Sequence, residues 1–208
     1  MIKRLMRLSN LSKEKLVTKI NIPAVIFAGG KSSRMGKDKA LLPFGRFETL
    51  VEFQYQRLKE IFETVSISWK SEKVRFGANS IFDEKSFSEI SAPTVGLYSI
   101  LKKIKTEYVF IISVDSPFFG ETEISKLFQE IDNGYEIIVP QTEYGIEPLI
   151  AIYSKSLLEK IRTMLENGNH RLGKMIKDSN TKYVRFENKD VFTNLNYPEE
   201  YEKALEIV

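Results

Sequence analysis

A nearly all-apolar run from Tyr108 to Val114 limits most strongly what this chain can fold into. Its sequence is YVFIISV, and it ends at Asp115 and a turn through Pro117. A strand that is apolar on both faces belongs inside a parallel sheet with helices covering both sides. The run therefore predicts an α/β domain with this strand at its centre.

Strand-like and helix-like segments alternate along the rest of the chain, with short links. Apolar or β-branched runs predict strands at 22–28, 65–69, 80–82, 136–140, 148–153 and 182–186. Helical periodicity predicts helices at 47–61, 96–104, 121–132, 155–166, 170–177 and 198–206. We therefore predict a single Rossmann-like α/β domain over 22–208, with a mostly parallel twisted sheet and helices on both faces. Ligands of such sheets bind beyond the carboxyl ends of the strands, so Gly29 and Asp115 are expected at one edge.

The composition excludes several classes of function. A length of 208 residues suits one domain, and the absence of cysteine excludes disulfides, thiolate metal sites and cysteine nucleophiles. A single histidine, His170, argues against a histidine-rich zinc or iron site. No apolar run reaches the roughly 20 residues that span a bilayer. We expect a cytoplasmic protein with no membrane partner, since the lack of cysteine suits a reducing compartment.

The net charge of +3 is concentrated at the N-terminus. Residues 1–21 hold six basic residues and one glutamate, which leaves 25 basic and 27 acidic residues in 22–208. A nucleic-acid-binding domain is expected to be basic itself, so we predict no nucleic-acid partner. Residues 1–21 form a basic extension that is too polar for a signal peptide. We expect it to be flexible or loosely docked, with contact to its own domain, a partner or a membrane as the alternatives.

The segment FAGGKSSRMGKDK, residues 27–39, has the features of a phosphate-binding loop. Gly29 and Gly30 allow close approach of the backbone to a ligand, and consecutive exposed amides bind anions. One carboxylate, Asp38, is opposed by four cations, which are Lys31, Arg34, Lys37 and Lys39. The segment matches neither the dinucleotide fingerprint nor the P-loop, because Gly36 and Lys37 precede Asp38 instead of serine or threonine. Composition alone leaves a triphosphate site and a solvated turn as alternatives.

Asp115 is the candidate metal ligand, because it ends the central strand and is expected opposite the glycine-rich loop. Mg²⁺ takes one or two carboxylate oxygens and completes its coordination with water and phosphate. The alternative is an aspartate that forms an Asx-turn or caps the next helix.

Residues 28–41 follow the pattern A-G-G-x-S-x-R-M-G-x-D-K-A-L. This pattern resembles the signature of molybdenum cofactor guanylyltransferases, within the wider group of sugar-phosphate and cofactor nucleotidyltransferases. Related cytidylyltransferases read Ala-Ala-Gly at the first turn and Pro-Lys at the end, so this chain resembles the guanine enzymes. The resemblance implies a fold of the nucleotidyltransferase type. It also implies transfer of GMP from GTP to the terminal phosphate of molybdopterin, with release of pyrophosphate.

The resemblance also assigns a nucleotide site and a metal site. Arg34 and Lys39 act on the phosphates, and Asp115 holds Mg²⁺. The nucleotide-binding residues are Phe27, Ala28, Gly29, Gly30, Lys39, Ser68, Asp83 and Asp115. Ser68 stands where relatives often have asparagine and offers one hydrogen-bond donor, so its contact to guanosine stays open. Asp83 is alternatively a surface-loop aspartate.

The C-terminal part resembles the family's acceptor site. Glu147–Tyr153 resembles the strand that lines it, Gly168–Leu172 the helix entry that follows, and Thr193–Glu200 the closing N-x-N-x-P-E motif. The implied acceptor-binding residues are Arg171, Asn194 and Asn196. The alternatives are an exposed surface arginine and asparagines that cap the last helix.

The expected partners are GTP, molybdopterin and Mg²⁺, with transient contacts to cofactor-delivery proteins or recipient molybdoenzymes. A phosphate monoester is already anionic near neutral pH, so the reaction needs no strong general base. The nearest alternative is a related transferase that uses CTP or a sugar-phosphate acceptor. More distant alternatives are a non-catalytic nucleotide-binding regulator and a partner-binding module that acts through the basic extension.

Overall fold

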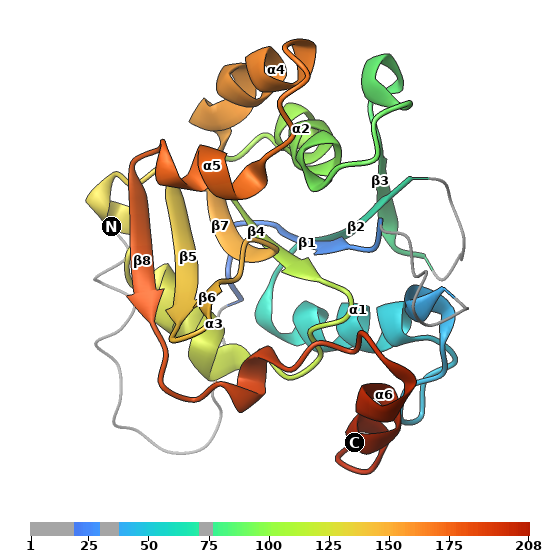
Figure 1. Cartoon of the computed structure of the whole chain (residues 1–208). Coiled ribbons are helices and arrows are strands. Elements are labelled where there is room, and N and C mark those ends of the chain that lie inside the picture. The colour runs from blue at the N-terminus through green and yellow to red at the C-terminus, as the bar shows by residue number, and fades with distance from the viewer. Residues whose placement is uncertain (1–18, 30–37, 71–76) are drawn as a thin grey trace.

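An eight-stranded sheet lies between two layers of helices in the computed structural model, which describes residues 19–29, 38–70 and 77–208 (Figure 1). The strands are β1 (Ala24–Phe27), β2 (Val65–Trp69), β3 (Asn79–Phe82), β4 (Tyr108–Ser113), β5 (Ile137–Thr142), β6 (Gly145–Ile146), β7 (Ile150–Ser154) and β8 (Thr181–Arg185). The helices are α1 (Leu50–Ile61), α2 (Pro93–Lys103), α3 (Glu121–Phe128), α4 (Leu158–Glu166), α5 (Leu172–Lys177) and α6 (Pro198–Leu205). The strand order is β3-β2-β1-β4-β7-β5-β6, and β8 pairs with β5.

The sheet is mixed, and β1, after which the glycine-rich segment begins, lies among parallel neighbours. Strand β1 runs parallel to β2 and β4, β2 to β3, and β5 to β8. Strand β7 runs antiparallel to β4 and β5, because a short hairpin through β6 joins it to β5. Only antiparallel neighbours can be joined by so short a connection. The predicted single α/β domain with a mostly parallel sheet is confirmed.

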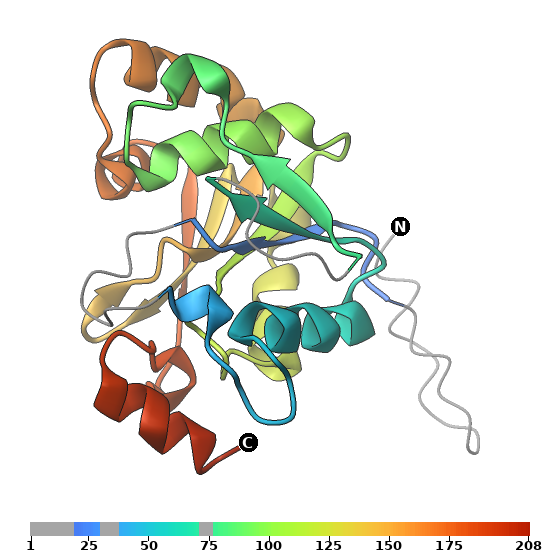
Figure 2. The ribbon, with the colours of Figure 1, turned by 90° about the vertical axis from the view of Figure 1, so that its right-hand side faces the viewer.

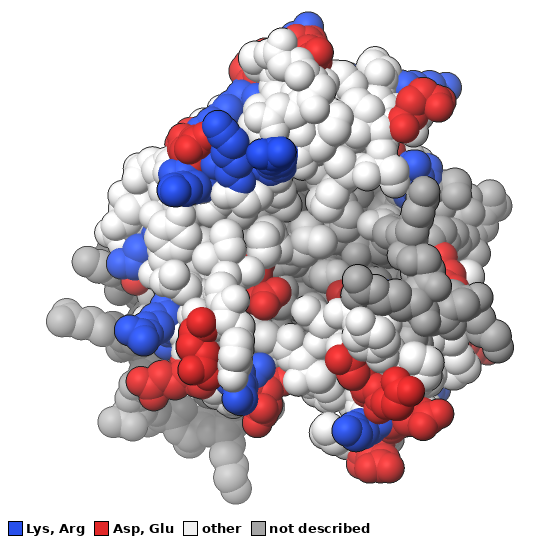
Figure 3. All heavy atoms as spheres, in the orientation of Figure 1, with Lys and Arg blue, Asp and Glu red and all other residues white. Residues whose placement is uncertain are grey.

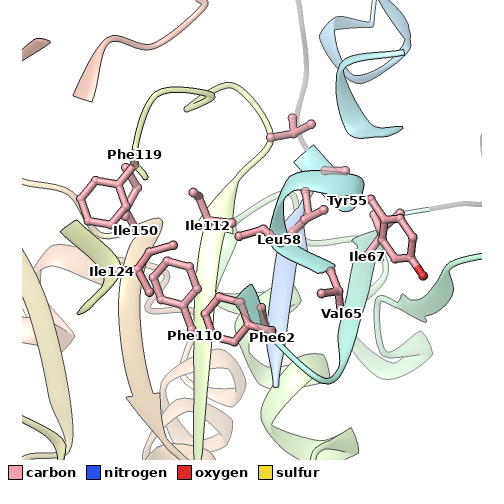
Figure 4. Close-up of a cluster of buried hydrophobic side chains, with 14 of the residues drawn as sticks. Tyr55, Leu58, Phe62, Val65, Ile67, Phe110, Ile112, Phe119, Ile124 and Ile150 are labelled. Carbon is pink, nitrogen blue, oxygen red and sulfur yellow. The ribbon is translucent and has the colours of Figure 1, made fainter. Parts of the chain in front are cut away.

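Side chains of the central strands alternate between two hydrophobic cores. Ala24 and Ile26 face the core under α1, α3 and α6, whereas Val25 and Phe27 face the core under α2, α4 and α5. Figure 2 shows these helix layers on opposite sides of the sheet. In the first core, the rings of Phe62 and Phe110 stack with centroids 5.5 Å apart (Figure 4). This two-sided burial explains why β4 is apolar along its length.

Helix α2 approaches β1 unusually closely at Gly96. A Cβ atom at Gly96 would lie 2.5 Å from the ring of Phe27 and 3.6 Å from a carboxylate oxygen of Asp83. The absence of a side chain therefore lets Phe27 pack beneath α2, next to the loop that follows β3.

The sequence predicted every α-helix and, apart from the two-residue β6, every strand of the described residues, with ends shifted by a few residues. It did not predict the short 3-10 helices. Of the predicted extension 1–21, the structure describes residues 19–21, and Ile20 forms a parallel bridge with Phe62. The expected behaviour of residues 1–18 lies outside the described residues. Within the described ranges, no helix combines the length and the apolar character that a membrane crossing requires.

Candidate active site

Three of the expected functional residues follow the carboxyl ends of parallel strands. Gly29 follows β1, Asp83 follows β3, and Asp115 comes two residues after β4. Lys70, to which sequence reasoning assigned no role, follows β2. Register pairs Phe27 with Ser68 on one side and with Ser113 on the other, so these strands end side by side. The predicted meeting of the Gly29 and Asp115 segments at one edge is confirmed.

The ammonium group of Lys39 joins three motifs that are far apart in the sequence. Lys39 begins a short 3-10 helix, Lys39–Leu41, whose first turn Asp38 caps by accepting from the Ala40 amide at 3.2 Å. The ammonium forms an ion pair with Asp115 and donates to Asn196 Oδ1 at 2.9 Å. The Lys39 and Asp115 side chains are only 16% and 15% exposed, so solvent screens this pair less than a surface pair. The structure thus brings three of the predicted site residues into direct contact.

Hydrogen bonds join the closing N-x-N motif to the loop that carries Asp115. The Leu195 amide donates to the Asp115 carbonyl at 2.9 Å, and Ser116 Oγ donates to Asn194 Oδ1 at 2.6 Å. At the start of α6, Glu200 Oε2 accepts from the amides of Asn196 and Tyr197, at 2.7 and 2.9 Å. The side chains of Asn194 and Asn196 therefore face the site, and Glu200 takes the capping role that had been the alternative for them.

A buried glutamine on α1 forms hydrogen bonds with the loop that carries Asp115. Gln54 is fully buried, and its amide nitrogen lies 3.3, 3.4 and 3.0 Å from the carbonyls of residues 113, 114 and 116. Arg57 donates to Gln54 Oε1 and to the Phe119 carbonyl, at 2.6 and 2.7 Å. Burial lowers the pKa of Arg57 to about 10, an effect that the charge of Glu123 partly offsets. Sequence reasoning placed Gln54 in a helix and assigned it no role, because its contacts lie about 60 residues away.

Asp83 lines an open pocket on the β3 side of the sheet edge, with Lys70, Phe82, Lys85 and Ser88. Burial raises the pKa of the Asp83 carboxyl, and the nearby charge of Lys70 lowers it in part. This half-buried carboxylate is better placed for a ligand than a loop aspartate in open water. Ser68 is only 2% exposed, so the described structure does not offer its hydroxyl to a ligand.

The remaining predicted residues divide into three groups. Phe27, Ala28 and Gly29 lie at the end of β1, whereas Gly30 and Arg34 fall outside the described residues. Arg171 is exposed at the start of α5, and no described contact joins it to Lys39 or Asp115. Figure 3 shows a hollow near the middle of this face, with Lys and Arg side chains gathered above it where Figure 1 places α5. Arg171 thus precedes a helix that carries Lys174 and Lys177, and it lies apart from the Lys39 contacts.

A second carboxylate, Glu147, lies near Asp115. Burial raises the pKa of Glu147, and the charge of Asp115 raises it further. Sequence reasoning placed Glu147 in the acceptor strand without a role of its own.

The family model for the MobA-like NTP transferase domain matches residues 24–183 of this chain. A molybdenum cofactor guanylyltransferase of Campylobacter jejuni subsp. doylei is 41% identical over 86% of this chain and 93% of the relative. The chain belongs to the molybdenum cofactor guanylyltransferase family. A guanylyltransferase of Helicobacter pylori strain G27 is 31% identical over 90% of this chain and 94% of its own length.

A solved structure shares the fold at lower identity. Molybdopterin-guanine dinucleotide biosynthesis protein A from Archaeoglobus fulgidus superposes with a TM-score of 0.76 at 21% identity, covering 89% of this chain and 98% of that one. Membership of the guanylyltransferase family thus rests on sequence, and the archaeal structure shows that the fold is of the nucleotidyltransferase type.

The donor atoms of this guanylyltransferase-family site suit a hard divalent cation. Among the described residues, no group of three or more His, Cys, Asp or Glu side chains is placed to enclose a metal ion. Mg²⁺ needs no such cage, because it takes one or two carboxylates and completes its coordination with water and substrate phosphate. Asp115 and the amide oxygen of Asn196 both contact the Lys39 ammonium, so oxygen ligands already converge on a positive charge here.

Proposed function

We propose that this chain transfers GMP from GTP to the terminal phosphate of molybdopterin and releases pyrophosphate, in a Mg²⁺-dependent reaction. The observation that carries the proposal is the contact of Lys39 with Asp115 and Asn196 at the carboxyl edge of the sheet. The relatives named molybdenum cofactor guanylyltransferase support the choice of substrates. Gly29-Gly30 and Asp38-Lys39, which match the guanine pattern in the sequence, agree with that choice.

The chemistry requires positioning and charge neutralisation more than proton transfer. An oxygen of the acceptor phosphate attacks the α-phosphorus of GTP in line, and the bond from that phosphorus to the bridging oxygen of pyrophosphate breaks. The attacking monoester is already anionic, so no general base is needed. Negative charge grows on the leaving pyrophosphate, and fixed cations nearby stabilise the transition state.

Lys39 and Asp115 take complementary roles in this proposal. Lys39 neutralises phosphate charge, and its ammonium exchanges the Asp115 carboxylate for phosphate oxygens when GTP binds. Asp115, with the Asn196 oxygen beside it, would hold Mg²⁺, which supplies charge neutralisation and orients phosphate oxygens when bound. The residues at the Asp83 pocket bind the nucleoside part, and Asn194, Asn196 and Arg171 bind the acceptor.

We also propose a cytoplasmic enzyme that meets cofactor-delivery proteins and recipient molybdoenzymes transiently. The proposed compartment is supported by the cysteine-free sequence, which suits a reducing environment, and the proposed partners follow from the proposed product.

Thermal-shift binding of GTP, CTP, ATP and UTP, each with and without Mg²⁺, tests the proposal without a pterin substrate. A ligand that binds only the folded state raises its apparent stability by mass action. We expect a selective shift with GTP that Mg²⁺ increases. A preference for CTP would replace the guanylyl product, and the absence of any nucleotide shift would overturn the proposed site.

A further inference from the structure

Strands β6 and β7 both pair with the same edge of β5. The segment that joins them has three more residues than the facing stretch of β5. Along this edge β5 pairs Ile138 with Ile152 and Gln141 with Ile146. Three steps along β5 thus correspond to six steps along its partner. The Glu147 amide still donates to the Pro140 carbonyl of β5 at 3.2 Å, so the excess falls between Glu147 and Ile152. The Ile150 amide closes the excursion as a turn by donating to the Glu147 carbonyl at 3.0 Å. Irregular insertions of this kind beside active sites commonly re-aim a side chain.

Glu147 lies at the same end of the sheet as Asp115. The last pair between the antiparallel strands β4 and β7 is Ile112 with Ile150. Asp115 lies three residues beyond Ile112, and Glu147 lies three residues before Ile150, so both leave the sheet at that end. Beyond the effect of burial, the charge of Asp115 raises the pKa of Glu147, which agrees with their position at the same end of the sheet.

The two carboxylates differ in their partners. Asp115 pairs with Lys39 and accepts from Ser113 Oγ. Within the described ranges, the Glu147 carboxylate accepts no hydrogen bond and forms no ion pair, although it is half-buried. A carboxylate withdrawn from water without a partner raises the free energy of the folded state, and a cation reverses that effect.

The position of Glu147 also indicates which substrate it serves. Strand β7 lies on the opposite side of β4 from β1, β2 and β3, whose ends carry Gly29, Lys70 and Asp83. Glu147 therefore lies on the acceptor side of Asp115. A bare carboxylate there would repel an incoming phosphate monoester, unless a divalent cation lies between the two negative groups.

We propose that Glu147 is a second carboxylate ligand of the divalent cation that Asp115 holds, on the acceptor side of the site. This inference rests on the proposed function, which supplies the cation. Two carboxylates remain within what Mg²⁺ accepts beside water and phosphate. The excursion between β6 and β7 then begins at this ligand, where the pairing with β5 is interrupted.

Mn²⁺ in place of Mg²⁺ tests this ligand without turnover, because free Mn²⁺ is counted by its electron paramagnetic resonance signal. Mn²⁺ is titrated into the full chain with α,β-methylene GTP, which cannot transfer its nucleotidyl group. We expect Glu147→Gln and Glu147→Ala to weaken Mn²⁺ binding roughly tenfold or more. Glu143→Gln is the matched control, because Glu143 is an exposed glutamate on the same hairpin and should leave the affinity unchanged.

Asp115→Asn separates this inference from the proposed function. Wild-type Mn²⁺ affinity in both Glu147 variants, with affinity lost in Asp115→Asn, would overturn the role of Glu147 and leave the proposed metal site standing. Wild-type affinity in all three variants would overturn the metal site as well. Thermal unfolding of each variant without nucleotide confirms that the titrated proteins are folded.

Discussion

Lys39 is bonded to the side chain that is proposed to hold the cation. Its ammonium group contacts Asp115 Oδ2 while Ser113 Oγ donates to Asp115 Oδ1, so both carboxylate oxygens are engaged. A metal ion that binds without nucleotide must compete with the Lys39 ammonium for the Asp115 carboxylate. When GTP is bound, its phosphates offer the ammonium other anionic partners. At the scale of this residue, nucleotide binding and metal binding should therefore support each other.

Lys39→Met should have opposite effects on two measurements. Turnover should fall about a hundredfold or more, because a preorganised positive charge on the phosphates is lost. Mn²⁺ binding to the nucleotide-free enzyme should become tighter, because no ammonium competes for Asp115. The measurements are pyrophosphate release and a Mn²⁺ titration, with Lys103→Met as the exposed control. Undiminished turnover would contradict the role given to Lys39, and looser Mn²⁺ binding would contradict the competition.

Asp83→Asn should stabilise the nucleotide-free fold while weakening GTP binding. Burial raises the pKa of Asp83 in the folded state, so its stabilising contribution is present below the unfolded-state pKa and is lost as pH rises through the folded-state value. The ionised carboxylate therefore lowers stability at neutral pH, and asparagine removes that cost. In thermal unfolding at neutral pH, the Tm of Asp83→Asn should exceed the wild-type Tm. This difference should shrink at acidic pH. An exposed-site control, Asp190→Asn, should show no such difference, and a lower neutral Tm for Asp83→Asn would contradict the argument.

At the scale of elements, two helices contact the strand ends that carry the site. Helix α1 holds the Asp115 loop through Gln54, and α2 packs against the end of β1 through Gly96. Neither contact touches a substrate. Both should nevertheless affect catalysis, because a small displacement of Asp115 or Phe27 changes the geometry of the site.

Gln54→Leu should lower both stability and turnover. The substitution keeps the side-chain size but leaves the carbonyls of residues 113, 114 and 116 and the buried Arg57 without their glutamine partner. A buried polar group that loses its partner costs about 1–3 kcal/mol. Urea unfolding gives the loss in stability, and Gln56→Leu on the exposed face of α1 is the matched control. Equal stability and turnover in the two variants would show that the Gln54 contacts do not position the loop.

Gly96→Ala should disturb the nucleotide side of the site. The added Cβ would lie 2.5 Å from the Phe27 ring, so either the ring or α2 must move. Such overpacking costs typically about 1–3 kcal/mol, and GTP binding should weaken as Phe27 shifts. Gly173→Ala in α5, where a Cβ meets nothing within 4 Å, should be neutral or slightly stabilising. Wild-type stability and GTP affinity in Gly96→Ala would contradict the packing argument.

At the scale of the whole molecule, the central strands are enclosed by two separate cores. Both faces of β1 and β4 are buried, whereas β3 and β8 have several exposed residues. Amide hydrogen exchange should therefore be slowest in β1 and β4 and faster in β3 and β8, because edge strands open without global unfolding. Equal protection across these four strands would show that the sheet opens only as a unit.

The sequence predicted the fold well because its dominant signals are local. An apolar run such as 108–114 indicates a buried strand, and the carboxyl-end rule brought Gly29 and Asp115 together. The direction of β7 was not readable, because the apolar segment 148–153 suits either orientation. The contacts of Gln54 and the excursion at Glu147 were missed for a related reason, since both depend on pairings between distant segments. The tie of Asn194 and Asn196 to the Asp115 loop also required the structure.

The hydrogen bonds between the N-x-N motif and the Asp115 loop affect the order in which the site forms during synthesis. Every described strand of the sheet precedes residue 186, whereas Asn194 and Asn196 follow the last strand. Domains begin to fold from the N-terminus while the ribosome is still adding residues. The sheet, Lys39 and Asp115 can therefore come together on a growing chain before their partner asparagines exist. The complete site therefore forms only after residues 194–196 have emerged, so folding of the sheet should precede competence for the reaction.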